Sequence, residues 1–135
     1  MLRRDYFIKQ MEEFGKVLAQ ILGYKKQKEF EKFEEEISAA LKKYSDQDLK
    51  SLELKSGEEF EKEILMSQKL DFSQKKIIAA VLFEKMIYFS ELNAPERASE
   101  LKAKCLLLYQ HIQTNATENE YDLDVHYKLG FLKNN

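Results

Sequence analysis

Two long stretches of this chain are apolar on nearly all sides, Ile77–Leu92 and Ala98–Ile112, and the turn Asn93-Ala94-Pro95-Glu96 separates them. A helix without a polar face must be covered by protein on several sides. Asn93 and Glu96 have the spacing of a capping box at the start of the second helix. The two stretches therefore predict a helical hairpin over about residues 73–113, at the centre of an all-helical domain.

Glycine and proline are scarce, with four Gly and one Pro in 135 residues. Sheet-rich folds need many turns, and turns recruit these two residue types. The length suits one domain spanning residues 1–135. We therefore predict an all-α protein of about five to seven helices, arranged as stacked antiparallel hairpins.

Apolar residues at helical spacing predict an N-terminal helix pair over about residues 5–44. Gly15 falls inside the first of these helices, where glycine costs about 1 kcal/mol relative to alanine. A close crossing with a neighbouring helix would explain it, and a contact point for a partner is the alternative. The two apolar stripes are Phe7, Met11, Phe14, Leu18 and Ile21, then Phe30, Phe33, Ile37, Leu41 and Tyr44.

Shorter helices are expected between and after these pairs. Ser56 and Glu59 have capping-box spacing, and the helix that they begin should end near Lys69. Ser73 is expected to begin the first apolar helix. A C-terminal helix over about residues 124–133 has two compatible starts, Asp124 and Thr117, of which we favour Asp124. Its expected core positions are Val125, Leu129 and Leu132.

A short internal echo links two predicted helix starts. Asp71-Phe72-Ser73 and Asp122-Leu123-Asp124 each place an acid, an apolar residue and a capping residue in the same order, 51 positions apart. This offset spans one helical hairpin and its linker. Such a pattern is typical of arrays of stacked hairpins.

The opening of the chain resembles that of small uncharacterised bacterial all-helical proteins. The resemblance is carried by Arg4-Asp5-Tyr6-Phe7-Ile8, Met11-Glu12 and Leu18-Ala19. The hairpin over about 72–112 is similar in layout to tetratricopeptide helix pairs, with Ala79 and Ala80 available as the small residue of the first helix. The closing proline of such a repeat, expected near Gln113, is absent. The resemblance implies a tetratricopeptide-like fold without known enzymatic activity.

Charge and hydropathy exclude several classes of partner. Lys and Arg number 22 against 24 Asp and Glu, and only three residues are Arg, so nucleic acid is not an expected partner. No uncharged apolar run approaches the ~20 residues that span a bilayer, and no signal peptide is evident. We therefore predict a cytoplasmic protein without a membrane partner.

Reactive or metal-binding side chains are few. Cys105 shares an apolar stripe with Leu101 and Leu108, which favours a buried structural thiol over a nucleophile paired with His111. Asp122 and His126 lie four residues apart, with Glu118 one turn earlier, and this spacing can hold a metal. A solvated helix face explains these residues equally simply and is preferred. No cofactor is expected, and we favour a non-enzyme.

The aromatic content points towards binding. Seven Tyr and nine Phe exceed what two apolar stripes need, and Tyr88, Tyr109 and Tyr127 lie off the main stripes of their helices. Each is either an exposed anchor for a partner or part of the core. The sequence therefore predicts a non-catalytic interaction or scaffold module that binds a protein partner or itself. The alternative is a small-ligand or metal-binding bundle, possibly enzymatic, with a polar pocket at His111 or His126.

Overall fold

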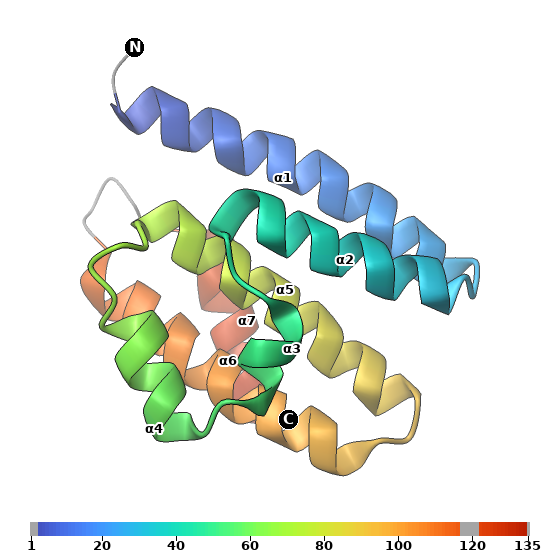
Figure 1. Cartoon of the computed structure of the whole chain (residues 1–135). Coiled ribbons are helices and arrows are strands. Elements are labelled where there is room, and N and C mark those ends of the chain that lie inside the picture. Colours follow the sequence, from blue (N-terminus) through green and yellow to red (C-terminus); the bar gives the residue numbers. More distant parts are fainter. Residues whose placement is uncertain (1–2, 117–121, 135) are drawn as a thin grey trace.

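The computed structural model describes residues 3–116 and 122–134, and over these residues it contains helices and no strands. The all-α prediction is therefore confirmed for the described chain (Figure 1). The α-helices are α1 (Arg3–Lys26), α2 (Phe30–Ser45), α3 (Leu49–Leu54), α4 (Gly57–Phe60), α5 (Phe72–Glu91), α6 (Pro95–Asn115) and α7 (Leu123–Asn134), and a π-helix, η1 (Glu61–Leu65), follows α4.

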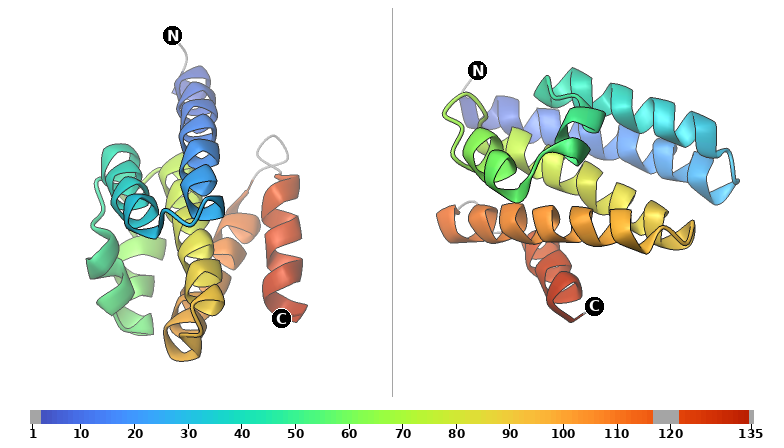
Figure 2. Two further views of the ribbon diagram at one scale, coloured as in Figure 1. Left: turned by 90° about the vertical axis from the view of Figure 1, so that its right-hand side faces the viewer. Right: turned by 60° about the horizontal axis from the view of Figure 1, so that its bottom comes forward.

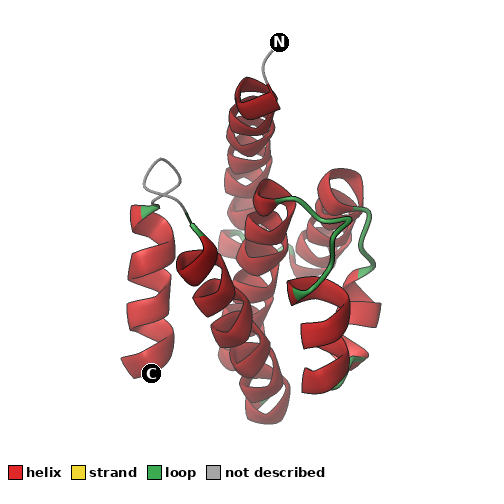
Figure 3. Cartoon of the chain, turned by 90° about the vertical axis from the view of Figure 1, so that its left-hand side faces the viewer, coloured by secondary structure: helices red, strands yellow, loops and turns green. Residues whose placement is uncertain are grey.

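The α5–α6 hairpin lies at the centre of the molecule. The α1–α2 hairpin covers α5, while α3, α4 and η1 lie on one side of the central hairpin and α7 on the other (Figures 2 and 3). Eleven of the twenty residues of α5 are buried, compared with six of the twenty-one in α6. The first apolar stretch is thus covered on several sides, as predicted, whereas α6 leaves more of its surface open.

The core combines side chains from every long helix. In α2, Phe33, Ile37 and Leu41 are fully buried, as the second apolar stripe predicts. Among residues 6–26 of α1, the buried ones are Phe14 and Ile21, because this helix covers the bundle from outside. The central hairpin and α7 supply the remaining predicted positions, among them Ile77, Ile78, Leu82, Leu101, Cys105, Leu108, Ile112, Val125, Leu129 and Leu132.

The turn between α5 and α6 differs from the prediction. Asn93 adopts a left-handed conformation with φ of 58°. Its N–H donates to the Ser90 carbonyl (3.2 Å), and the Ala94 N–H donates to the Phe89 carbonyl (2.9 Å). Asn93 therefore closes α5, with Pro95 at the first position of α6. The predicted capping box of Asn93 and Glu96 is wrong.

The start of α5 lies just before the predicted one. Asp71 rather than Ser73 is the N-cap, and its Oδ1 accepts the Gln74 N–H at 2.8 Å. The Ser73 hydroxyl donates to the same carboxylate at 2.7 Å. Helix α7 begins at Leu123, next to the predicted Asp124, and the rival start at Thr117 lies outside the described residues.

The Ser56–Glu59 capping box is confirmed. The Glu59 N–H donates to the Ser56 Oγ at 3.1 Å, and the Ser56 N–H donates to the Glu59 carboxylate at 3.3 Å. The helix that follows widens into the π-helix at Glu61 and ends at Leu65, short of the predicted end near Lys69. Ile64 and Leu65 of this π-helix are both buried.

Gly15 lies on the exposed side of α1, where a Cβ atom would meet no other atom within 4 Å. The expected close helix crossing is therefore absent. Because alanine loses less backbone entropy in a helix, Gly15→Ala is expected to raise the free energy of unfolding by about 1 kcal/mol. Chemical denaturation followed by circular dichroism measures this change. A destabilised variant would show that the position makes a contact that the structure lacks.

Candidate interaction surface

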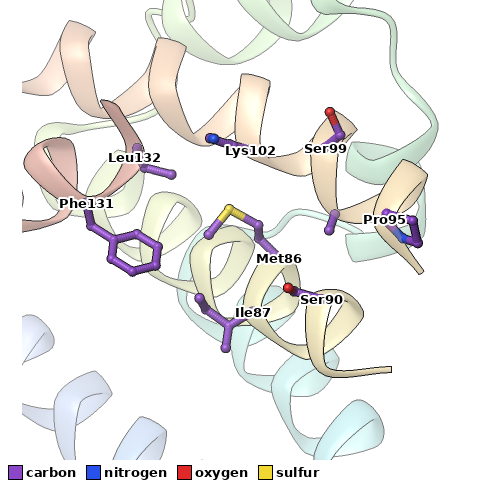
Figure 4. Close-up of a pocket in the computed structure, with 9 residues that line it drawn as sticks. Met86, Ile87, Ser90, Pro95, Ser99, Lys102, Phe131 and Leu132 are labelled. Carbon is purple, nitrogen blue, oxygen red and sulfur yellow. The ribbon is translucent and has the colours of Figure 1, made fainter. Parts of the chain in front are cut away.

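A groove of about 500 Å³ lies between the central hairpin and α7 (Figure 4). Its apolar wall is formed by Met86 and Ile87 of α5 and by Phe131 and Leu132 of α7. Lys102 of α6 is the charged residue at its rim. The remaining lining residues are Ser90, Pro95, Ala98 and Ser99. The groove thus joins an apolar wall to a single cationic side chain.

The outer face of α7 is the side of the helix opposite its buried residues Val125, Leu129 and Leu132. Leu123 and Tyr127 are 71% and 72% exposed, and they lie four residues apart on one side of the helix. Gly130 extends the same face, and a Cβ atom there would meet no atom within 4 Å. The opposite face of α7 carries its buried side chains. In the described chain no element covers the outer face of α7 (Figures 2 and 3).

The three tyrosines proposed as anchors divide into two groups. Tyr88 is 4% exposed and packs on Phe33, with ring centroids 4.9 Å apart. Tyr109 is 2% exposed and contacts the edge of Phe83, and its burial raises its pKa. Both belong to the core and cannot act as exposed anchors in this fold. Tyr127 alone of the three is open to a partner.

A polar cluster also converges from four helices. Lys85 of α5 is a charged residue on the buried face of the helix, and only 5% of it is exposed. Its Nζ lies 3.2 Å from Glu34 Oε1 of α2 and 3.7 Å from Glu53 Oε1 of α3. Arg97 of α6 lies 3.6 Å from Glu53 Oε2 and stacks on the ring of Phe89. We call these five residues the Lys85 cluster.

The Lys85 cluster holds α3 against the central hairpin. The ammonium group is matched by two carboxylates and by the face of Phe89, 4.5 Å away, so it is satisfied within the protein. Glu53 Oε1 is buried without a hydrogen bond from the described residues. Sequence spacing missed this cluster because its members are far apart in the chain. The available signal was a lysine in an apolar row.

The structure does not gather the residues that could bind a metal, Asp122, His126 and Glu118, into a described site. Asp122 Oδ2 lies 2.8 Å from Lys76 Nζ. Burial raises the pKa of Asp122, but Lys76 and backbone N–H groups outweigh this effect and lower it overall. His126 is exposed, and Glu118 lies outside the described residues. Within residues 3–116 and 122–134, no three His, Cys, Asp or Glu side chains gather as a metal site.

The other histidine lies beside a lysine. His111 Nε2 is 3.3 Å from Lys75 Nζ, which also donates to the Leu65 carbonyl at 2.8 Å. Burial lowers the pKa of His111, and the positive charge of Lys75 lowers it further. Burial also lowers the pKa of Lys75. A protonated imidazole at this position would face a second cation.

This pairing predicts a pH-dependent stability. Below the ordinary His pKa of 6.5, the unfolded chain takes up a proton that His111 in the folded chain resists. The free energy of unfolding should therefore fall as the pH drops below 6.5, and His111→Gln should reduce this slope. Urea denaturation at several pH values between about 5.5 and 7.5 measures it. His126→Gln is the control, and an unchanged slope in His111→Gln would contradict the prediction.

Cys105 is fully buried, and burial raises the pKa of its thiol, which agrees with the predicted structural role.

Every helix in the part of the chain that the structure describes is too short or too polar to traverse a bilayer. Comparisons with protein-family models, with curated proteins and with solved structures found no match to this chain.

Proposed function

We propose that this protein is a non-catalytic helical interaction module that binds a protein partner through α7 and the adjoining groove. The observation that supports the proposal is the outer face of α7, where Leu123 and Tyr127 are each more than two-thirds exposed. Exposed apolar side chains beside a groove are typical of protein-binding surfaces. Tyrosine is enriched among the residues that dominate binding energies.

The proposal includes a tetratricopeptide-like organisation. Two helical hairpins pack on each other, and α7 follows them as a single helix. The two echoed segments begin α5 and α7: Asp71 and Asp122 directly precede these helices, and each side chain accepts a backbone N–H from the first turn. In this proposal, α7 corresponds to the first helix of a hairpin, as α5 does. A location in the cytoplasm, where a lone thiol stays reduced, remains part of the proposal.

Site-specific crosslinking in the native host tests the proposal. A photoreactive phenylalanine analogue replaces Tyr127 in one variant. In a control variant it replaces Met66, which is 69% exposed and directly follows η1. We expect one protein to crosslink at position 127 and not at position 66. Size-exclusion chromatography with light scattering then shows whether that protein is a second copy. A strict monomer that gives the same crosslinks at both positions would contradict the proposal.

A further inference from the structure

The groove between the central hairpin and α7 has an apolar lining that comes from three helices. Met86 of α5 is 5% exposed, and Figure 4 shows its side chain and the ring of Phe131 of α7 pointing towards each other across the groove. On the α6 side the lining includes the small residues Ala98 and Ser99, which leave space open. The volume of about 500 Å³ lies in the range of small-molecule sites, which are mostly apolar with a few polar groups.

The charged residue of this lining has no counter-ion in the described chain. Lys102 is partly buried, and no carboxylate or carbonyl oxygen of the described residues pairs with its ammonium group. Every other partly or fully buried lysine in the described ranges has such an oxygen within 3.5 Å: Lys25, Lys55, Lys75, Lys76, Lys85, Lys104 and Lys128. The lysine that lacks an oxygen partner is therefore the one that borders the groove.

This combination of lining and charge defines the chemistry of a suitable ligand. An apolar body would replace water on Met86 and Phe131. A carboxylate would accept a charge-assisted hydrogen bond from Lys102. A cationic head group would be repelled by the same lysine, and a doubly charged phosphate would find only one cation in the lining. The groove therefore favours an amphipathic molecule with a single negative charge.

We propose that this groove binds a small amphipathic monocarboxylate, whose apolar body lies between Met86 and Phe131 and whose carboxylate pairs with Lys102. This site goes beyond the proposed function, because its ligand is a small molecule and not a protein. The exposed Leu123 and Tyr127 lie on the side of α7 opposite its buried residues. A ligand in the groove thus leaves these two side chains available to a protein partner.

Calorimetric titration with three probes that share a decyl chain tests the inference. The probes are decanoate, decanol and decyltrimethylammonium, each kept below the concentration at which it forms micelles. We expect decanoate to bind at one site, about tenfold more tightly than decanol, and decyltrimethylammonium not to bind. Equal affinities of the three probes would show adventitious apolar binding only and overturn the inference, as would no binding of decanoate.

A charge-removing variant tests the role of Lys102. Lys102→Gln should weaken the binding of decanoate about tenfold and leave that of decanol unchanged, because only the carboxylate uses the ammonium group. Lys62→Gln is the matched control, since Lys62 is exposed on η1, on the other side of the central hairpin. Decanoate affinity that is the same in Lys102→Gln and Lys62→Gln would overturn the assignment of Lys102.

Methionine methyl groups show where the probe binds. Met86 lines the groove, whereas Met66 is 69% exposed and directly follows η1. In protein labelled with ¹³C at the methionine methyl groups, decanoate should shift the NMR signal of Met86 and leave that of Met66 in place. Met86→Leu and Met66→Leu assign the two signals by their loss. A Met86 signal that moves no more than the Met66 signal would overturn the placement of the ligand.

The two proposals fail in different ways, because decanoate binding is measured on the purified protein and crosslinking in the native host. A protein crosslinked at position 127, together with no binding of decanoate, would leave the interaction function standing and reject the ligand site. Specific decanoate binding without a crosslinked protein would do the reverse. Absence of both would reject both proposals.

Discussion

Leu108→Asp is expected to lower the free energy of unfolding by about 4 kcal/mol, the largest effect of any exchange considered for this protein. Leu108 is fully buried in the middle of α6, within the core that joins the central hairpin to its neighbours. An aspartate there would lose its hydration without gaining a cation. Urea denaturation followed by circular dichroism measures the change.

Two further exchanges in α6 make this result interpretable. Leu108→Ala, which removes apolar contacts but adds no charge, should cost about 3 kcal/mol. Ala103→Asp adds the same charge on the exposed side of the same helix and should change stability by no more than about 0.5 kcal/mol. If Leu108→Asp melted like Ala103→Asp, the described packing of α6 would be wrong.

Lys85→Met is expected to destabilise the protein by about 3 kcal/mol, because it removes the cation that faces the buried Oε1 of Glu53, which has no hydrogen bond from the described residues. Methionine keeps most of the volume of the lysine stem, so the loss reports the charge rather than a cavity. Arg97 remains 3.6 Å from Glu53 Oε2 and so reduces the loss of stability. Equilibrium denaturation in low salt measures the effect.

A double-mutant cycle separates the ion pair from other effects. Lys85→Met combined with Glu53→Met should be more stable than the sum of the two single losses predicts, since the charges left without a partner, on Glu34 and Arg97, are about half exposed or more. Lys42→Met is the control, because Lys42 and its partner Asp46 are largely exposed and their pair contributes less than about 1 kcal/mol. A Lys85→Met variant as stable as Lys42→Met would show that the Lys85 cluster is solvated.

The periodicity of apolar residues predicts most of this fold. Phe33, Ile37 and Leu41 are buried because a stripe at intervals of three and four can face only one side of a helix. Helix ends are less predictable, since several residues compete for each cap. Asn93 can cap either neighbouring helix, and its left-handed backbone assigns it to α5.

The candidate surface depends on which elements meet, and sequence spacing does not contain this information. Tyr88, Tyr109 and Tyr127 each lie off a main stripe, yet Phe33 and Phe83 cover the first two, and the third stays exposed. Lys85 occupies a core position of α5, but its carboxylate partners are 51 and 32 residues distant in sequence. Only the packing of α2 and α3 on α5 brings them together.

Because Cys105 is buried, the reactivity of its thiol reports transient opening of the helical core. A thiol enclosed by the core cannot meet an alkylating reagent until the helices around it separate. Pulsed alkylation under native conditions, followed by mass spectrometry, therefore measures the rate at which the native state opens. It needs no denaturant, dye or engineered label. The same assay would show whether a bound partner slows this opening, and so how much the partner stabilises the folded state. The protein carries no tryptophan whose fluorescence could report this.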